Sequence, residues 1–218
     1  MPPSSSARPG VRRTSTLRAG AAESAWLALV PVLDAYDLLY ARYWRTESIG
    51  AVLAFDRRVY HGPDRRFADG TVLRAGITMG ELHLQNRRVL ALHARATHPL
   101  AVGLAFRREI VLSLRALAQR AARDPAVGSL PAFHARTILT AGAEHLGFVC
   151  EYDGAGRWAP LRALHFHLML CRYHAAGFGR WPATLRPVRA LWLTSAELER
   201  RYRGAPAVRG AAEACASA

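Results

Sequence analysis

The sequence predicts a single α+β domain, with a mixed or antiparallel sheet of about four to six strands covered by about five or six helices. Segments with helical spacing of apolar residues and segments with apolar–polar alternation follow in the order helix, strands, helices, strand, helix, strand, helix. The chain has 218 residues, 51% hydrophobic and 21% charged, which fits one domain with a sizeable core. We expect this domain over residues 23–203, between disordered tails at 1–22 and 204–218 that lack a hydrophobic period.

The first predicted element is a helix over residues 22–45, whose apolar residues fall at spacings of three and four. Pro31 predicts a short turn before a main helix over Val32–Tyr43. Aromatic residues gather near its end, namely Tyr36, Tyr40, Tyr43 and Trp44. The segment 32–45 can therefore pack on the domain core as a terminal helix, or it can lie on a membrane surface.

Three segments that follow are typical of strands joined by short turns. They cover residues 49–60, 71–73 and 78–85. The links between them contain His61-Gly62-Pro63-Asp64 and Asp69-Gly70, which are common turn sequences. Such short links predict an antiparallel meander.

The rest of the chain alternates helices with single strands. Asn86 is a suitable N-cap for a helix over 87–96, and Pro99 opens a long helix that ends near Arg123. Further helices are predicted over 138–146 and 161–173, and strands over 147–152 and 189–193. Thr194-Ser195-Ala196-Glu197 is a capping box that starts a last helix through Tyr202.

The strand at 78–85 carries the most suggestive chemistry. Glu81 and His83 share one face of this strand, while Leu82 and Leu84 point into the core. A carboxylate beside an imidazole can act as an acid/base pair, because the carboxylate fixes the histidine tautomer and raises its basicity. The alternative is that both side chains are solvated on an open sheet face.

Four further residues are candidate ligand contacts. Asn86 and Arg87 lie at the corner between this strand and the next helix, where a helix N-terminus suits an anion. Thr137 and Arg172 are expected to join them if the site is a concave pocket. Alternatively, Asn86 only caps its helix.

No metal site and no cofactor are predicted. His167, Cys171 and His174 share one helical face, but a single helix cannot surround a tetrahedral ion, and their apolar neighbours indicate a buried helix. The three cysteines are odd in number and form no CxxC, which argues against a zinc ribbon or a disulfide framework. No P-loop, GxGxxG, GxSxG or HExxH motif is present.

The net charge of +14 comes from 30 basic residues, all of them arginine, against 16 acidic ones. Arginine in place of lysine is typical of GC-rich coding, and these arginines are scattered along the whole chain. Scattered arginines favour a solvated surface over nucleic-acid binding, which remains the weakest alternative. The most apolar early stretch, residues 25–32, is too short to cross a membrane, so we expect a cytoplasmic protein with peripheral membrane contact as the open alternative.

Several runs together resemble the YkoP-like domain family of bacteria over roughly residues 26–203. They are Val32-Leu33-Asp34-x-x-Asp37-Leu-Leu-Tyr40, Asp69-Gly70-Thr71-Val72-Leu73, Gly80-Glu81-Leu82-His83-Leu84-x-Asn86, His145-Leu146-Gly147-Phe148 and Leu191-Trp192-Leu193-Thr194-Ser195-x-x-Leu198-x-x-x-Tyr202. Members of that family occur as stand-alone proteins or attached to polysaccharide deacetylases. The resemblance implies a setting in bacterial cell-envelope or polysaccharide metabolism rather than a mechanism.

These observations lead to two functional hypotheses of different classes. The first is an accessory or ligand-binding module that works with an envelope polysaccharide enzyme and recognises a glycan or an anionic lipid-linked sugar. The second is a small transferase or hydrolase on an envelope substrate, with Glu81 and His83 as acid/base and with Asn86 and Arg87 as substrate or phosphate contacts.

Overall fold

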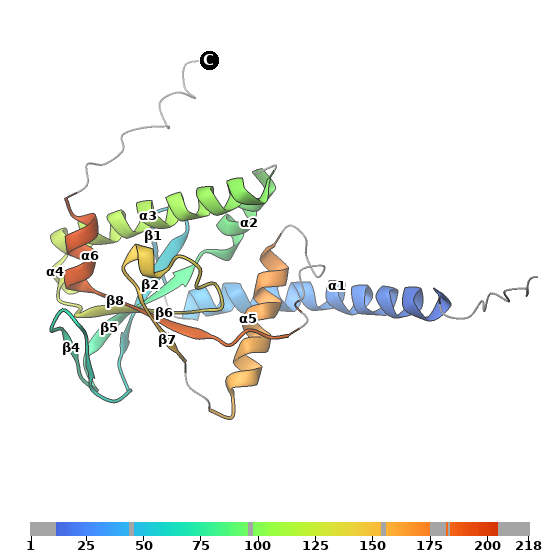
Figure 1. The fold of residues 1–218 in the computed structure, drawn as a ribbon, viewed down its shortest axis with the longest axis horizontal. Coiled ribbons are helices and arrows are strands. Elements are labelled where there is room, and N and C mark those ends of the chain that lie inside the picture. Colours follow the sequence, from blue (N-terminus) through green and yellow to red (C-terminus); the bar gives the residue numbers. More distant parts are fainter. Residues whose placement is uncertain are drawn as a thin grey trace, which may run out of the picture.

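A mixed sheet of six strands forms the centre of the fold (Figure 1). The computed structural model describes residues 12–43, 46–95, 98–153, 156–174, 182 and 184–204. The sheet order is β1-β2-β5-β6-β8-β7. These strands are β1 (Glu47–Ile49), β2 (Leu53–Val59), β5 (Thr78–Leu84), β6 (Ala132–Thr137), β7 (Val149–Tyr152) and β8 (Arg189–Thr194). All neighbours are antiparallel except β5 and β6, which run parallel, so the predicted α+β class is confirmed.

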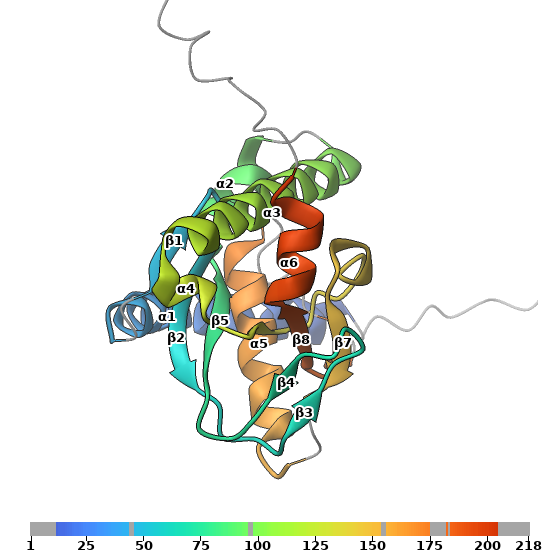
Figure 2. The same cartoon turned by 90° about the vertical axis from the view of Figure 1, so that its left-hand side faces the viewer.

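Helices cover both faces of this sheet. They are α1 (Arg12–Tyr43), α2 (Asn86–Arg95), α3 (Pro99–Arg123), α4 (Pro125–Gly128), α5 (Ala159–Tyr173) and α6 (Ser195–Tyr202). The first face, which we call the core face, packs residues such as Phe55 and Phe133 against Leu114 and Leu117 of α3 and Leu198 of α6. Figure 2 shows α3 and α6 lying together over this face.

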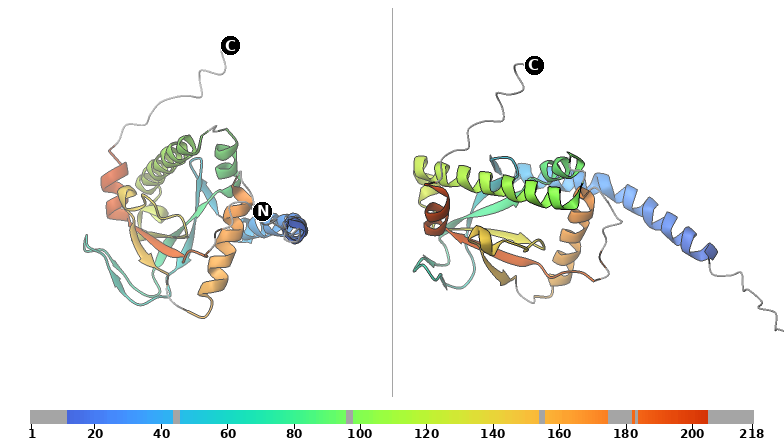
Figure 3. Two further views of the ribbon diagram at one scale, coloured as in Figure 1. Left: turned by 45° about the vertical axis from the view of Figure 1, so that its right-hand side comes forward. Right: turned by 45° about the horizontal axis from the view of Figure 1, so that its top comes forward.

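The opposite face, called the second face, is covered by different elements. Strands β3 (Arg65–Arg66) and β4 (Val72–Leu73) form a separate two-stranded sheet, which contributes Phe67 and Leu73 to a small apolar cluster around Trp192. Helix α5 covers another part of the second face, and α1 lies beside α5 at the outside of the domain (Figure 3). The second face therefore lies between the β3–β4 sheet and the α1–α5 pair.

Two predicted helices begin where the sequence predicts their first residues. The long helix α3 runs from Pro99 to Arg123, and the side chain of His98 caps its first turn. Helix α6 follows its predicted capping box, in which the Thr194 hydroxyl accepts a hydrogen bond from the backbone N–H of Glu197 at 3.1 Å. Local capping chemistry therefore defines these two elements.

The predicted start of the first helix is wrong, whereas its predicted end at Tyr43 is confirmed. Helix α1 begins at Arg12, within the segment predicted as a tail, and it continues through Pro31 without a break. Pro31 has no backbone N–H to donate to the carbonyl of Leu27, so one helical hydrogen bond is missing. Because Leu27 is exposed, water can donate to this carbonyl instead. Trp44, residues 1–11 and residues 205–218 with Cys215 among them lie outside the described residues.

Two other predictions are corrected. Strand β2 pairs directly with β5, so the expected three-stranded meander does not form. The segment 138–146 is not a regular helix, because Gly142 adopts a left-handed conformation (φ 79°) and only a 3-10 turn, Glu144–Leu146, follows. Strand β6, immediately before it, is absent from the sequence prediction.

Within the described residues, no helix is both long and apolar enough to span a membrane.

Candidate functional site

The sheet opens beyond one point of contact between β5 and β6. These parallel strands pair only at Gly80–Phe133 and Glu81–His134. Gly80 permits the close approach, because a Cβ atom there would lie 2.3 Å from Cδ1 of the fully buried Phe133 ring. Past these pairs, residues 82–86 and 135–139 line the same groove. The groove thus lies at the carboxyl ends of two parallel strands, a common place for ligands in open sheets.

The groove has a volume of about 1290 Å³, and its walls are mostly apolar. Wall residues come from α1, α2, α3 and α5 as well as from the sheet. The apolar ones include Leu38, Leu84, Val89, Leu92, Val102, Phe106, Leu139, Phe166 and Met169. Polar side chains that reach it include Glu81, His83, Asn86, Arg87, Arg136 and Thr137. A cavity of this size can hold a substantial part of an organic ligand.

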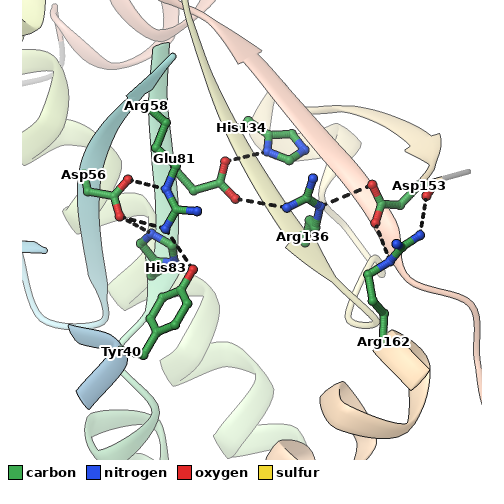
Figure 4. A network of polar contacts seen from close by, with 9 residues as sticks. All are labelled: Tyr40, Asp56, Arg58, Glu81, His83, His134, Arg136, Asp153 and Arg162. Atoms are coloured by element: carbon green, nitrogen blue, oxygen red, sulfur yellow. Dashed lines mark hydrogen bonds and ion pairs between the residues drawn. The ribbon is translucent and has the colours of Figure 1, made fainter. Parts of the chain in front are cut away.

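A row of polar residues crosses the second face beside this groove. Asp56 of β2 lies opposite Glu81 of β5, and Glu81 lies opposite His134 of β6. Nδ1 of His134 is hydrogen-bonded to Oε2 of Glu81 at 2.7 Å, and both side chains are buried. The sequence places Glu81 and His83 on one face, but Glu81 takes His134 as its hydrogen-bonding partner (Figure 4).

His83 is paired with Asp56 instead. Nε2 of His83 lies 3.1 Å from Oδ2 of Asp56, and Nε and Nη2 of Arg58 donate to the same carboxylate at 2.8 and 3.0 Å. Arg58 is held in turn by the hydroxyl of Tyr40 on α1 at 2.8 Å. Burial raises the pKa of Asp56, but the hydrogen bonds from His83 and Arg58 outweigh it, so that pKa lies below its ordinary value. Asp56 is therefore a fixed anion that orients the His83 ring.

Glu81 also connects to a chain of charges that ends on α5. Nη1 of Arg136 lies 3.9 Å from Oε1 of Glu81, and Nε of Arg136 lies 3.2 Å from Asp153 (Figure 4). Asp153 also pairs with Arg162 of α5 at 3.4 Å. These pairs fix Arg136 at the groove.

The predicted ligand contacts Asn86, Arg87 and Thr137 all line the groove. Nδ2 of Asn86 donates to Asp37 of α1 at 3.1 Å, so Asn86 connects two walls. The hydroxyl of Thr137 accepts from the backbone N–H of Leu139 at 2.8 Å and shapes the loop after β6. Arg87 makes no ion pair with the described residues and is available to a ligand.

Arg172, the remaining predicted contact, lies apart from the groove lining. Its guanidinium donates two hydrogen bonds, at 3.0 and 2.8 Å, to Asp34 of α1. These hydrogen bonds from Arg172 hold the pKa of Asp34 below its ordinary value, although burial opposes them. Arg172 therefore fastens α1 to α5 in this structure.

His167 and Cys171 are buried inside α5. Nδ1 of His167 lies 2.7 Å from the carbonyl of Ala163, and Nε2 accepts from the backbone N–H of Arg186 at 3.2 Å. Both ring nitrogens are therefore used by the backbone. Across the described part of the chain, no three His, Cys, Asp or Glu residues are grouped so that they could hold a metal ion.

Comparison with protein families gives a match over most of the chain. The family model of the YkoP domain matches residues 27–202. Neither the curated proteins nor the solved structures give a significant match. The matched range contains every strand of the sheet and every groove residue described above.

Proposed function

The chain belongs to the YkoP domain family, and we propose that it is a ligand-binding module of bacterial cell-envelope polysaccharide metabolism whose groove takes an anionic lipid-linked sugar. The single observation that carries this proposal is a large groove whose walls are mostly apolar and to which arginine and other polar side chains also contribute. Such a lining matches a ligand with a hydrocarbon part and a charged, hydroxylated part.

The apolar walls suit the hydrocarbon part of this ligand. Leu92, Phe106, Phe166 and Met169 belong to three different helices, and all four side chains are only half buried. A hydrocarbon chain would remove this apolar surface from water, at about 25 cal/mol per Å² buried. A free sugar alone would leave most of it exposed.

The start of α2 suits the anionic part. Arg87 and Arg88 both line the groove there, and the first turn of α2 contains no acidic residue. Arginine forms paired hydrogen bonds with phosphate oxygens, and the N–H groups of a helix N-terminus add to the attraction. Asn86 and Arg136 also line the groove and offer hydrogen-bonding groups to sugar hydroxyls.

The test uses farnesyl phosphate, a soluble prenyl phosphate, with farnesol and inorganic phosphate as the two half-ligands. Calorimetric titration should show that farnesyl phosphate binds at least about tenfold more tightly than either half. Arg87→Glu should weaken binding of farnesyl phosphate about tenfold or more, because it replaces attraction by repulsion. Arg74→Glu, at an exposed position outside the groove, is the matched control and should change little.

Two results would overturn this assignment. One is the absence of farnesyl phosphate binding to the folded wild-type protein. The other is equal weakening by Arg87→Glu and Arg74→Glu, which would mean that net charge alone attracts the ligand.

The Asp56–His83 pair favours a second candidate, a hydrolase acting on an ester in the same groove. His83 would take a proton from water as the water oxygen bonds to the acyl carbon or phosphorus. The bond to the leaving oxygen then breaks, and that oxygen keeps the electron pair and takes up a proton. His83 lines the groove, and Asp56 fixes its tautomer, so Asp56 replaces Glu81 as the partner of this base.

Hydrolysis of p-nitrophenyl acetate and p-nitrophenyl phosphate tests this candidate. His83→Gln should lower any rate by about a hundredfold or more. Asp56→Asn should also lower the rate, because the carboxylate no longer orients the His83 ring. A rate that is insensitive to His83→Gln would exclude His83 as the base.

A further inference from the structure

In helix α1, Asp34, Asp37 and Tyr40 direct their polar groups toward the rest of the domain. Asp34 pairs with Arg172, and Asp37 accepts hydrogen bonds from Asn86 and from the Tyr173 hydroxyl at 3.1 Å each. Tyr40 accepts from Arg58. The side of α1 that contacts the domain therefore combines hydrogen bonds and charges with apolar contacts, since Leu33 is buried and Trp26, Leu29 and Val30 are half buried.

The outward side of α1 is also apolar between residues 27 and 39, whereas a surface helix usually exposes a polar face to solvent. Its exposed residues are Leu27, Ala28, Pro31, Val32, Ala35, Tyr36, Leu38 and Leu39, followed by Arg42 and Tyr43. Between residues 27 and 39, where every side chain is described, no exposed position is charged. Leu27, Val32, Leu38 and Leu39 are each about 60% exposed, at 65%, 59%, 62% and 63%. We call these exposed residues the outer face of α1.

The position of α1 leaves this face accessible. Figures 1 and 3 show α1 at the outside of the domain, with its N-terminal half extending beyond the other elements. A continuous apolar face of this kind on a folded domain indicates a contact surface.

We propose that the outer face of α1 lies on an anionic membrane surface. Charge complementarity favours this occupant, because the chain has a net charge of +14 and anionic lipid headgroups attract arginines that lie near the membrane surface. Arg42 ends the outer face, and Arg87 is close enough to Asp34 of α1 to lower its pKa. Tyr36 and Tyr43 suit the boundary between headgroups and acyl chains.

The contact would be interfacial. No described helix could span a membrane, so α1 would lie in the plane of the headgroups with its polar side on the domain. The polar groups on this side already have hydrogen-bonding partners, which are Arg172, Asn86, Tyr173 and Arg58. They therefore need no new partner when the outer face enters the lipid.

This surface also connects to the groove, and in this respect the inference rests on the proposed function. Tyr36 and Leu38 belong to the outer face of α1 and also line the groove. A domain lying on its α1 would therefore open its groove at the bilayer surface. A lipid-linked ligand could then enter without its hydrocarbon part crossing water.

Co-sedimentation of the full chain with vesicles tests the surface. Vesicles of phosphatidylglycerol and phosphatidylcholine should bind the protein at least about tenfold more strongly than phosphatidylcholine alone, and added salt should weaken binding. Val32→Glu/Leu39→Glu should lower binding about tenfold or more, because neither residue lines the groove and both must leave the lipid. Leu100→Glu/Leu104→Glu, at exposed leucines of α3, changes the charge equally and should leave binding near the wild-type value.

Three outcomes would overturn this inference. The first is no preference for phosphatidylglycerol, and the second is equal loss of binding in the two double variants. The third is a second copy on the outer face, seen as wild-type dimers that Val32→Glu/Leu39→Glu turns into monomers without affecting vesicle binding. Titration of Val32→Glu/Leu39→Glu with farnesyl phosphate in solution tests the groove separately, because that binding should be unchanged even where vesicle binding is lost.

Discussion

Two carboxylate–histidine pairs, Asp56–His83 and Glu81–His134, lie next to each other on the second face of the sheet. Sequence alternation correctly places Glu81 and His83 on the same face of one strand. It could not show their partners, since Asp56 and His134 come from β2 and β6 and are brought close only by strand register. The hydrogen-bonding partners of Glu81 and His83 therefore depend on how the strands pair. The position of these two residues on one face of β5 could be predicted from the local sequence.

Asp56 provides a stability test at the scale of one residue. Asp56→Asn should lower the free energy of unfolding by about 3 kcal/mol, because it leaves the half-buried Arg58 and His83 without their anion. Glu47→Gln removes an ion pair with Arg120 between half-exposed side chains and should cost less than about 1 kcal/mol. Denaturant unfolding of both variants at neutral pH measures this difference. Equal effects would show that Asp56 contributes no more than a surface charge.

The pH dependence of this effect follows from the lowered pKa of Asp56. A carboxyl with a lowered folded pKa stabilises the fold fully above its unfolded pKa, about 3.9. As the pH falls below that value, the unfolded chain takes up the proton first, and the contribution is lost. The stability difference between wild type and Asp56→Asn should therefore be constant from about pH 7 to 5 and shrink below about pH 4. A difference that grows on acidification would contradict the assignment.

At the scale of elements, the predictions succeeded where local chemistry decides and failed where tertiary contacts decide. The caps of α3 and α6 are local, and both helices begin where the sequence predicts. Strand β6 could not be predicted from its local sequence, because it is stabilised by pairing with β5 on one side and β8 on the other. The same holds for α1, whose outward apolar residues mimic a core-facing pattern while Asp34 and Asp37 dock on the domain.

Gly80 tests how β5 and β6 come together. Gly80→Ala should destabilise the fold by about 1–3 kcal/mol, since the added methyl group meets the buried Phe133 ring. Gly103→Ala in α3 meets nothing within 4 Å and should stabilise by up to about 1 kcal/mol through helix propensity. Thermal unfolding of both variants measures the contrast. A neutral Gly80→Ala would mean that the strands separate easily at this point.

The docking of α1 gives a second test at this scale. Asp34→Ala removes the paired hydrogen bonds from Arg172 and leaves this guanidinium without its carboxylate. Amide hydrogen exchange should therefore become faster in residues 26–43, with little change in α3 or the central strands. Unchanged exchange in residues 26–43 would show that Leu33 and the aromatic contacts alone hold the helix.

At the scale of the whole molecule, part of the arginine charge is neutralised in local pairs, and the net charge of +14 comes from the arginines in excess of the acidic residues. Arginines that pair with carboxylates are Arg58, Arg65, Arg120, Arg136, Arg162, Arg172, Arg200, Arg201 and Arg203. Arginines engaged in this way are poorly placed to release counterions from a nucleic acid. We therefore expect no binding of random duplex DNA at about 100 mM salt in a gel-shift assay, and a stable complex there would restore the nucleic-acid hypothesis.

The groove is formed by residues from α1, α2, α3, α5 and the sheet where β5 and β6 separate. These residues come together only in the folded domain. The most direct test of its role is photo-crosslinking of the full chain with a benzophenone derivative of farnesyl phosphate, mapped by peptide mass spectrometry. The account predicts label in residues 82–92 and 161–173, lost when unlabelled farnesyl phosphate competes. Label confined to other surfaces, such as the β3–β4 sheet, or label that farnesyl phosphate does not displace, would contradict it.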